Sequence, residues 1–301
     1  MLFGNQGTQK IILEKAFEIA EKENVRIVFG AMVGSISQGV HSVDSDYDTR
    51  FLYVNPDFPK KIYNPNEYQE DMLVKRYYPE FETFYDKIPF WELTSFVQFL
   101  REPSIDKKYS VGLYNLIGWT FKSPYVWDPY GLSNKMIPLL KTFFNQELEL
   151  KYHISKIEEF FSKDSNDILV KDYLYSVISA ASIQYILKYD DFPPIHIMTL
   201  MNLEDDEKIR EKVYDYITYM RNESSRLREE KKDAGLKYSH YIMKVKRNEQ
   251  VDRYIEEWYR KGGEAINKAK KVIEISEERI SRIYDVINFS LNEGIIENIC
   301  K

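Results

Sequence analysis

The spacing of apolar and polar residues predicts strands mixed with helices in the first part of the chain. In the first segment, apolar residues recur at helical spacing between charged ones, which predicts an amphipathic helix. The apolar, β-branched run 25–33 predicts a buried strand that ends at Gly34. A second strand is expected to end with residues 51–54, before Asn55 and Pro56.

The pattern changes along the rest of the chain. Residues 55–80 are rich in Pro, Asn and Tyr without clear periodicity, which predicts a long, partly irregular connection. Residues 87–91 then favour a strand, and residues 92–100 favour a helix. Beyond Pro138 helices dominate, and they are expected over 139–161, 168–189, 203–231, 250–260 and 265–296.

Proline and glycine pairs mark the expected helix ends. Pro193-Pro194 is expected to separate two helices, and Gly262-Gly263 another pair. We therefore expect an α+β fold, in which a small mixed sheet with flanking helices is followed by a mainly helical C-terminal half. The expected domains are residues 1–130 and residues 131–301.

The overall charge argues against electrostatic binding of nucleic acid along the whole chain. The 301 residues include 42 Lys and Arg against 48 Asp and Glu, a formal net charge of -6. The run Arg226–Arg247 is nevertheless rich in Lys and Arg, with Tyr238 and Tyr241 between them. We favour a solvated helix face for this run, and the alternative is a patch that faces phosphates.

Cysteine usage and the absence of long apolar runs bear on the compartment. The single cysteine, Cys300, excludes an internal disulfide and a cysteine-based zinc site, which favours a reducing environment. The first segment lacks the apolar core of a signal peptide, and no apolar run reaches the roughly 18 residues of a membrane helix. We therefore expect a cytoplasmic protein that does not contact a membrane.

Candidate chemistry lies between the two predicted strands. Gly34 and Ser35 directly follow the first of them. A residue without Cβ lets a phosphate approach the backbone closely, and the serine adds a hydroxyl beside the backbone N–H groups. This pair is typical of a turn that binds phosphate.

Asp46 and Asp48 follow in the same segment and suggest a cation site. Alternate residues of a strand share a face, so both carboxylates would converge on one point. Two carboxylates repel each other unless a cation lies between them, and Mg²⁺ prefers oxygen ligands together with nucleotide phosphates. For Asp44 we favour a turn, because it lies in the loop before the strand.

These motifs resemble those of the DNA polymerase beta-type nucleotidyltransferase superfamily, whose signature is Gly-Ser, a spacer, then Asp-x-Asp on a strand. A closer resemblance is to the bacterial and phage family of predicted nucleotidyltransferases linked to RNA-repair gene sets. That family reads Gly-Ser-Arg-Ala-x-Gly and then Asp-Ser-Asp-Tyr-Asp-x-Arg. The matching residues here are Gly34, Ser35, Gly39, residues 44–48 and Arg50.

The resemblance implies a nucleotidyltransferase catalytic domain over residues 1–130. Asp46, Asp48 and a third carboxylate would bind Mg²⁺ or Mn²⁺. A nucleoside monophosphate would pass from a nucleoside triphosphate, such as ATP, to a hydroxyl of an RNA end, a protein or a small molecule. The third carboxylate is expected at Asp86, which could also accept the proton of the hydroxyl, and Glu92 is the alternative.

Further residues of the segment have expected roles. The resemblance implies that Gly34 and Ser35 bind the β- and γ-phosphates. For Arg50 we favour an ion pair with an active-site carboxylate over a direct contact with the triphosphate. His41 could contact a substrate or be a plain loop histidine. The other histidines lie too far apart in the sequence to suggest a metal site.

Two departures from the family keep a second function open. The Arg that the family places after Gly-Ser is Ile36 here, and the Arg usual in the helix around Tyr173 is absent. The alternative is a non-catalytic regulatory or antitoxin-like relative that binds a nucleotide or a protein. Intact Asp46 and Asp48 favour the enzyme, because an inert site has little physical reason to gather uncompensated carboxylates.

Overall fold

The chain folds into two compact units. The computed structural model describes residues 7–43, 45–55, 90–93, 97, 120–163, 167–230, 243–268 and 276–299. Unit 1 comprises Met1–Gly34, Tyr47–Phe144 and Ile273–Lys301, and unit 2 comprises Ser35–Asp46 and Asn145–Val272. The short segment Ser35–Asp46 therefore belongs to the same unit as most of the C-terminal half, and the predicted division at residue 130 stays a prediction.

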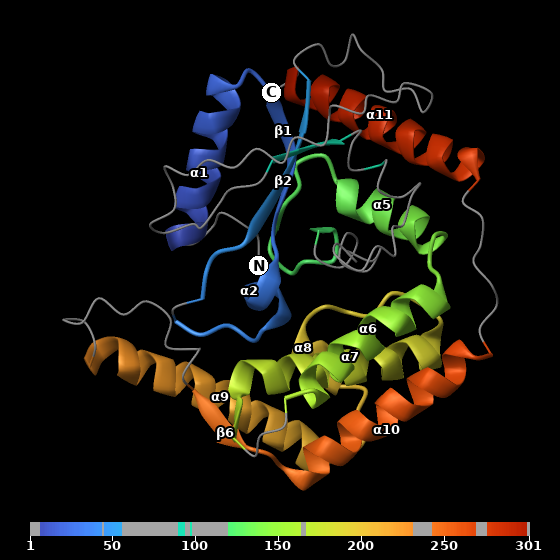
Figure 1. The fold of residues 1–301 in the computed structure, drawn as a ribbon. Coiled ribbons are helices and arrows are strands. Elements are labelled where there is room, and N and C mark those ends of the chain that lie inside the picture. The colour runs from blue at the N-terminus through green and yellow to red at the C-terminus, as the bar shows by residue number, and fades with distance from the viewer. Residues whose placement is uncertain are drawn as a thin grey trace. The chain divides into compact units, whose positions relative to one another are not determined.

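Unit 1 contains a four-stranded mixed sheet in the order β3-β2-β1-β4, and Figure 1 labels its two central strands, β1 and β2. Strand β1 (Arg26–Met32) pairs antiparallel with β2 (Thr49–Val54) and with β4 (Val126–Trp127). Strand β2 pairs parallel with β3 (Phe90–Glu92), and every residue of β2 is buried. The predicted α+β class with a small mixed sheet is confirmed.

In unit 1 one helix packs on the sheet and two others pack against each other. Helix α1 (Gly7–Lys22) packs on β1 through apolar residues at the predicted helical spacing, which are Ile12, Ala16, Ile19 and Ala20. Helix α5 (Leu132–Lys141) packs against α11 (Glu277–Ile299), with Lys135 Nζ 3.5 Å from Glu293 Oε2. The short helix α2 (Gly34–Gln38) follows β1 and leads the chain into unit 2.

Unit 2 is built mainly from helices that pack around α7. Its elements are β5 (Asp167–Leu169), β6 (Lys244–Lys246), α6 (Gln146–Phe161), α7 (Val170–Tyr189), α8 (Ile197–Met201), α9 (Glu207–Glu230) and α10 (Glu249–Ile266). Helices α6, α7 and α10 contact one another, as Figure 1 shows, and β5 pairs antiparallel with β6. The predicted helical character of the C-terminal half is confirmed. In the described parts of the chain, no helix has the length and apolar content needed to cross a membrane.

The helix expected over 139–161 is in fact two helices, α5 and α6. The Asp128 carboxylate accepts two backbone N–H groups in the first turn of α5, at 2.8 Å each. The Asn145 side chain accepts the Leu148 N–H at 3.1 Å and caps α6. These caps bind the otherwise unpaired N–H groups of each first turn, so they fix two separate helix starts.

The expected helix break at Gly262-Gly263 is wrong, because α10 runs through both residues to Ile266. A Cβ at Gly262 would lie 3.1 Å from Ile183 Cγ2. The glycine therefore permits a close approach of α10 to α7, which compensates for its low helix propensity. The helix expected over 265–296 corresponds to the last residues of α10 and to α11, which begins at Glu277.

The buried histidine of α6 predicts a loss of stability in acid. His153 is 1% exposed, and burial lowers its pKa from 6.5 to about 3. The His153 imidazole binds a proton more readily in the unfolded chain than in the folded one. The free energy of unfolding therefore decreases as the pH falls from 6.5 toward 3. We expect His153 to account for about 2 kcal/mol of lost stability between pH 7.5 and pH 5.

Urea unfolding of the wild type and of His153→Leu at the two pH values tests this expectation. The variant should lose less stability in acid than the wild type, because leucine binds no proton in either state. An equal loss in both proteins would contradict the role assigned to the buried imidazole.

Candidate active site

The predicted signature lies where β1 ends and β2 begins. The ladder that pairs Met32 with Thr49 continues by one step, because the Val33 N–H donates to Asp48 O at 2.8 Å. Asp46 and Asp48 were expected on the strand, and this is wrong, because β2 begins at Thr49. Strand β1 ends at Met32, so Asp48 takes part only through this one backbone hydrogen bond, and Asp46 lies before it in the chain.

Gly34 and Asp48 are brought into direct contact within unit 1. The backbone of Gly34 has a φ of +66°, in the left-handed region that favours glycine. A Cβ at this position would overlap Asp48 Oδ2 and would lie 3.0 Å from Asp48 Cγ. The first glycine of the signature therefore lets the backbone approach the second signature aspartate, whose side chain is exposed.

Arg50 is a buried cation beside this contact. It is 8% exposed, and its Nη1 donates to Thr120 Oγ1 at 2.8 Å. Burial lowers the pKa of Arg50 to about 10, while the negative charge of Asp48 acts in the opposite direction. Arg50 thus stays charged at neutral pH. Its interpretation as the partner of an active-site carboxylate remains a prediction, and this arrangement supports it.

The segment before Asp46 forms a compact turn in unit 2. Ser35 is 5% exposed, and its carbonyl accepts the Val40 N–H at 2.9 Å. The Ser42 N–H donates to Ser45 Oγ at 2.9 Å, and the Ser45 N–H donates to Ser42 O at 3.2 Å. These paired bonds fix the course of the chain directly before Asp46, which is half-buried.

The remaining acidic candidates are only partly described. Asp86 and Asp44 lie outside the described residues. Glu92, the alternative to Asp86, is the last residue of β3 and pairs with Tyr53. In the described ranges, no group of three or more His, Cys, Asp or Glu side chains could hold a metal ion. The predicted set of three carboxylates includes Asp86, so it stays a prediction.

The segment Ser35–Asp46 is fastened to α9 within unit 2. Arg221 Nη2 donates to Gly39 O at 3.3 Å, and the Val43 N–H donates to Ser224 Oγ at 3.2 Å. The Ser224 hydroxyl in turn donates to Arg221 O at 3.0 Å. One helix therefore holds the signature segment at two points through an arginine and a serine.

His196 lies directly against the second glycine of the signature. Gly39 has a φ of +77°, and a Cβ there would lie 2.6 Å from His196 Nε2. Sequence reasoning missed this histidine, because Gly39 and His196 are far apart in the chain and no spacing links them. The signature glycine was the only indication of this contact, because glycine is often found where another group approaches the backbone closely.

The two histidines of this region lie in a positively charged environment. Burial, followed by the charges of Arg221, His196 and Lys171, lowers the pKa of His41 from 6.5 to about 4. Burial and Arg221 also lower the pKa of His196. Both imidazoles are therefore neutral at pH 7, and the surrounding charge is positive.

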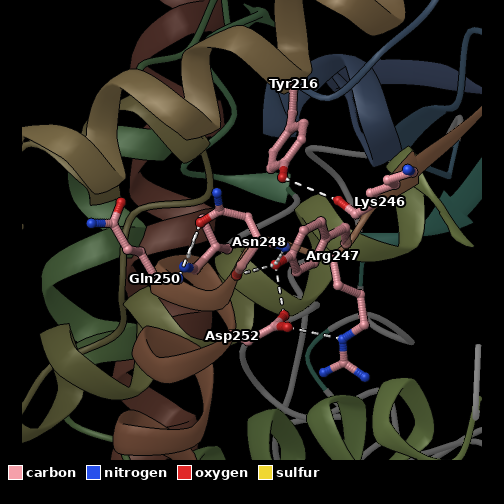
Figure 2. A network of polar contacts seen from close by, with 8 residues as sticks. Tyr216, Lys246, Arg247, Asn248, Gln250 and Asp252 are labelled. Atoms are coloured by element: carbon pink, nitrogen blue, oxygen red, sulfur yellow. Dashed lines mark hydrogen bonds and ion pairs between the residues drawn. The ribbon is translucent and has the colours of Figure 1, made fainter. Parts of the chain in front are cut away.

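Two arginines of the basic run Arg226–Arg247 form contacts within unit 2. Figure 2 shows Arg247 beside Asp252, with Arg247 Nε 3.0 Å from Asp252 Oδ2. The same guanidinium lies over the ring of Phe160, 5.5 Å from its centroid. Arg226, on α9, pairs with Glu223. Arg226 lies on a helix face as predicted, whereas Arg247 lies between β6 and α10, and residues 231–242 lie outside the described residues.

Tyr173 is part of the same network. Its hydroxyl donates to Asp252 Oδ1 at 2.6 Å, and burial together with this bond raises its pKa. Figure 2 also shows Asn248 with Gln250, where the Asn248 side chain accepts an N–H at the start of α10. The polar residues here connect α7 to α10, which is a structural role.

Comparison with known proteins bears on the N-terminal segment. Residues 8–100 match the model of a family described as RNA repair pathway DNA polymerase beta family. The predicted resemblance to polymerase beta-type nucleotidyltransferases is confirmed. The matched segment includes Gly34, Ser35, Asp46, Asp48 and Asp86.

A curated relative extends the similarity beyond this segment. The chain is 24% identical over 196 residues to the Bacillus subtilis (strain 168) protein named Uncharacterized protein YcgL. The similarity covers 64% of this chain and 68% of that protein. No solved structure matches the chain.

Proposed function

We propose that the protein is a metal-dependent nucleotidyltransferase, which moves a nucleoside monophosphate from a nucleoside triphosphate to a hydroxyl acceptor and releases pyrophosphate. The contact between Gly34 and the Asp48 carboxylate carries the proposal. It brings a side-chain-free stretch of backbone next to an exposed acid, so a triphosphate with its metal could meet both. The family match over residues 8–100 supports the same chemistry.

The acidic residues suit a hard divalent cation. Asp46 is half-buried and Asp48 is exposed, only one residue separates them, and both supply carboxylate oxygens. With Asp86 as the proposed third carboxylate, they would hold Mg²⁺ or Mn²⁺. When bound, the metal offsets the charge of the triphosphate and stabilises the entering and leaving oxygens.

Each proposed residue contributes a separate task. Gly34 and Ser35 bind the β- and γ-phosphates through backbone N–H groups and the serine hydroxyl. Arg50 holds the Asp48 carboxylate through its buried positive charge. Asp86 accepts the proton of the attacking hydroxyl. The new bond between the acceptor oxygen and the α-phosphorus forms as the bond to pyrophosphate breaks.

The proposal also assigns a role to each of the two parts of the chain and ranks the candidate acceptors. Residues 1–130 supply the catalytic chemistry, and the helical part, residues 131–301, contributes to acceptor choice. The family description names an RNA repair pathway, so an RNA end is the first acceptor to test, before a protein or a small molecule. A reducing, cytoplasmic compartment is assumed, because the chain carries one cysteine.

A transfer assay tests the proposal. The protein is incubated with Mg²⁺, each triphosphate labelled at the α-phosphate, and separate pools of RNA, protein and metabolites. Label that enters one pool identifies the acceptor class. The absence of both transfer and saturable nucleotide binding would overturn the proposal, whereas saturable binding without transfer in any pool would favour the non-catalytic relative.

Replacing Ser35 with alanine should weaken nucleotide binding without abolishing it. The variant loses one hydrogen bond to a charged phosphate, which corresponds to about 1.5 to 3 kcal/mol. Isothermal titration with a triphosphate and Mg²⁺ measures the change. Ser155→Ala, at an exposed position on α6, is the matched control, and equal affinity in both variants would contradict the role of Ser35.

A further inference from the structure

We propose that Arg221, His41 and His196 form a binding site for a phosphate dianion of the substrate. All three residues belong to unit 2, and they gather around the signature segment Ser35–Asp46. The inference rests on the proposed function, because a nucleotidyltransferase must hold phosphates of its donor or acceptor. His41 lies inside the matched segment, whereas His196 and Arg221 lie outside it.

The geometry brings the three side chains to one place. Arg221 reaches the carbonyl of Gly39 at 3.3 Å, and His196 lies against the same residue from the start of α8. His41 follows two residues after Gly39, and it is electrostatically coupled to both Arg221 and His196. The backbone at Gly39 is therefore the common point of the cluster.

The cluster is accessible to a ligand. Arg221 is exposed, and both imidazoles are half-buried. His41 Nδ1 is buried and has no hydrogen-bond partner in the described parts of the chain. A buried polar atom of this kind costs stability unless a ligand or water binds it. A bound oxyanion could form a hydrogen bond with His41 Nδ1 and an ion pair with the exposed Arg221 guanidinium.

The charges favour an anion over a cation. Arg221 donates to a carbonyl, and no carboxylate in the described residues forms an ion pair with it. Lys171, in the first turn of α7, adds positive charge at His41. A divalent metal on the two imidazoles would be repelled by these charges, whereas a dianion would be attracted. Protonated histidine and arginine both donate hydrogen bonds to phosphate oxygens.

A dianion should change the protonation of both histidines. Burial, followed by positive neighbours, lowers the pKa of the two imidazoles and keeps them neutral at pH 7. A bound dianion offsets those positive charges and favours the imidazolium form, so the pKa of His41 and of His196 should rise. Binding therefore takes up protons, and affinity should increase as the pH falls.

Arg221 has a purely structural alternative role, because its bond to Gly39 also fastens the segment to α9. Ser224 fastens the same segment through the Val43 N–H without carrying a charge. Ser224→Ala therefore loosens the segment and leaves the charge in place. Arg226→Ala removes a cation from the same helix, one that is already paired with Glu223. Ser224→Ala is therefore the control for the attachment of the segment to α9, and Arg226→Ala is the control for the loss of a positive charge.

The test is a nuclear magnetic resonance titration of protein labelled with ¹⁵N-histidine, which contains four imidazoles. The pKa of each is measured with and without sulfate, whose charge stays constant over the pH range. Sulfate should raise the pKa of His41 and His196 by about one unit or more, and should leave His153 unchanged. Arg221→Ala should abolish the shift, and Ser224→Ala and Arg226→Ala should retain it.

Pyrophosphate, a nucleoside triphosphate and an oligoribonucleotide are then compared as probes. A stronger response to the triphosphate identifies the donor as the source of the phosphate, and a stronger response to the oligonucleotide identifies the acceptor. We expect Arg221→Ala to weaken binding of the stronger probe about tenfold or more. The absence of a selective response of His41 and His196 to any of these anions would overturn the inference.

This experiment needs neither metal nor turnover, so its failure is distinguishable from that of the proposed function. Anion binding without nucleotidyl transfer would refute the proposed enzymatic function and support the proposed anion site. If Arg221→Ala catalyses transfer with the wild-type KM for both substrates, the proposed anion site is refuted and the proposed enzymatic function is supported.

Discussion

Asp46→Asn and Asp48→Asn should each lower the rate of nucleotidyl transfer by at least about 1000-fold. Asparagine has the size of aspartate but no negative charge, so the metal loses a ligand that offsets its charge. Several kcal/mol of charge stabilisation in the transition state depend on that metal. The rate is measured at saturating triphosphate and Mg²⁺, and circular dichroism checks that each variant is folded.

The matched control for these variants is Asp285→Asn. Asp285 is an exposed acid on α11, outside the signature, so its replacement should leave the rate unchanged. Transfer within about tenfold of the wild type by either Asp46→Asn or Asp48→Asn would contradict the metal site, because a lost ligand costs more than that.

Gly34→Ala should lower both the stability and the activity. Alanine at a φ of +66° is strained, and its Cβ would overlap Asp48 Oδ2. We expect a destabilisation of about 1 to 3 kcal/mol from the backbone strain and the displaced carboxylate. Transfer should fall at least about 100-fold, because a shift of the carboxylate by about 1 Å misplaces the reacting groups. Urea unfolding and the transfer assay measure the two effects.

Gly131 offers a close control for the strain. Its φ is +63°, and a Cβ there meets no atom within 4 Å. Gly131→Ala should therefore carry the same strain without the collision and should retain its transfer rate. Adding Asp48→Ala to Gly34→Ala should recover part of the lost stability, because it removes the colliding oxygen. Equal transfer rates in Gly34→Ala and Gly131→Ala would contradict the importance of the contact.

The elements that were predictable have strong local patterns. Helix α1 shows apolar residues at helical spacing, and β1 is a short apolar run bounded by Gly34. Gly262 was misread as a helix end, because its role depends on the approach of α7, which local sequence does not reveal. Strands β5 and β6 are only three residues long, too short for a recognisable alternation.

The candidate site was predictable only in part. The spacing of Gly34, Ser35, Asp46 and Asp48 predicted the resemblance to the family without tertiary information, and the Gly34 to Asp48 contact agrees with it. His196 and Arg221 reach the same segment from distant parts of the chain. No residue pattern near Gly39 could name them, because tertiary packing alone brings them there.

The most direct test of the proposed chemistry follows the two ends of one triphosphate. Label at the α-phosphate should enter the acceptor, and label at the γ-phosphate should appear in pyrophosphate in equal amount, and Asp48→Asn should form both products at least about 1000-fold more slowly. Release of γ-label as inorganic phosphate, or its transfer to the acceptor, would show a hydrolase or a kinase and would contradict the nucleotidyltransferase.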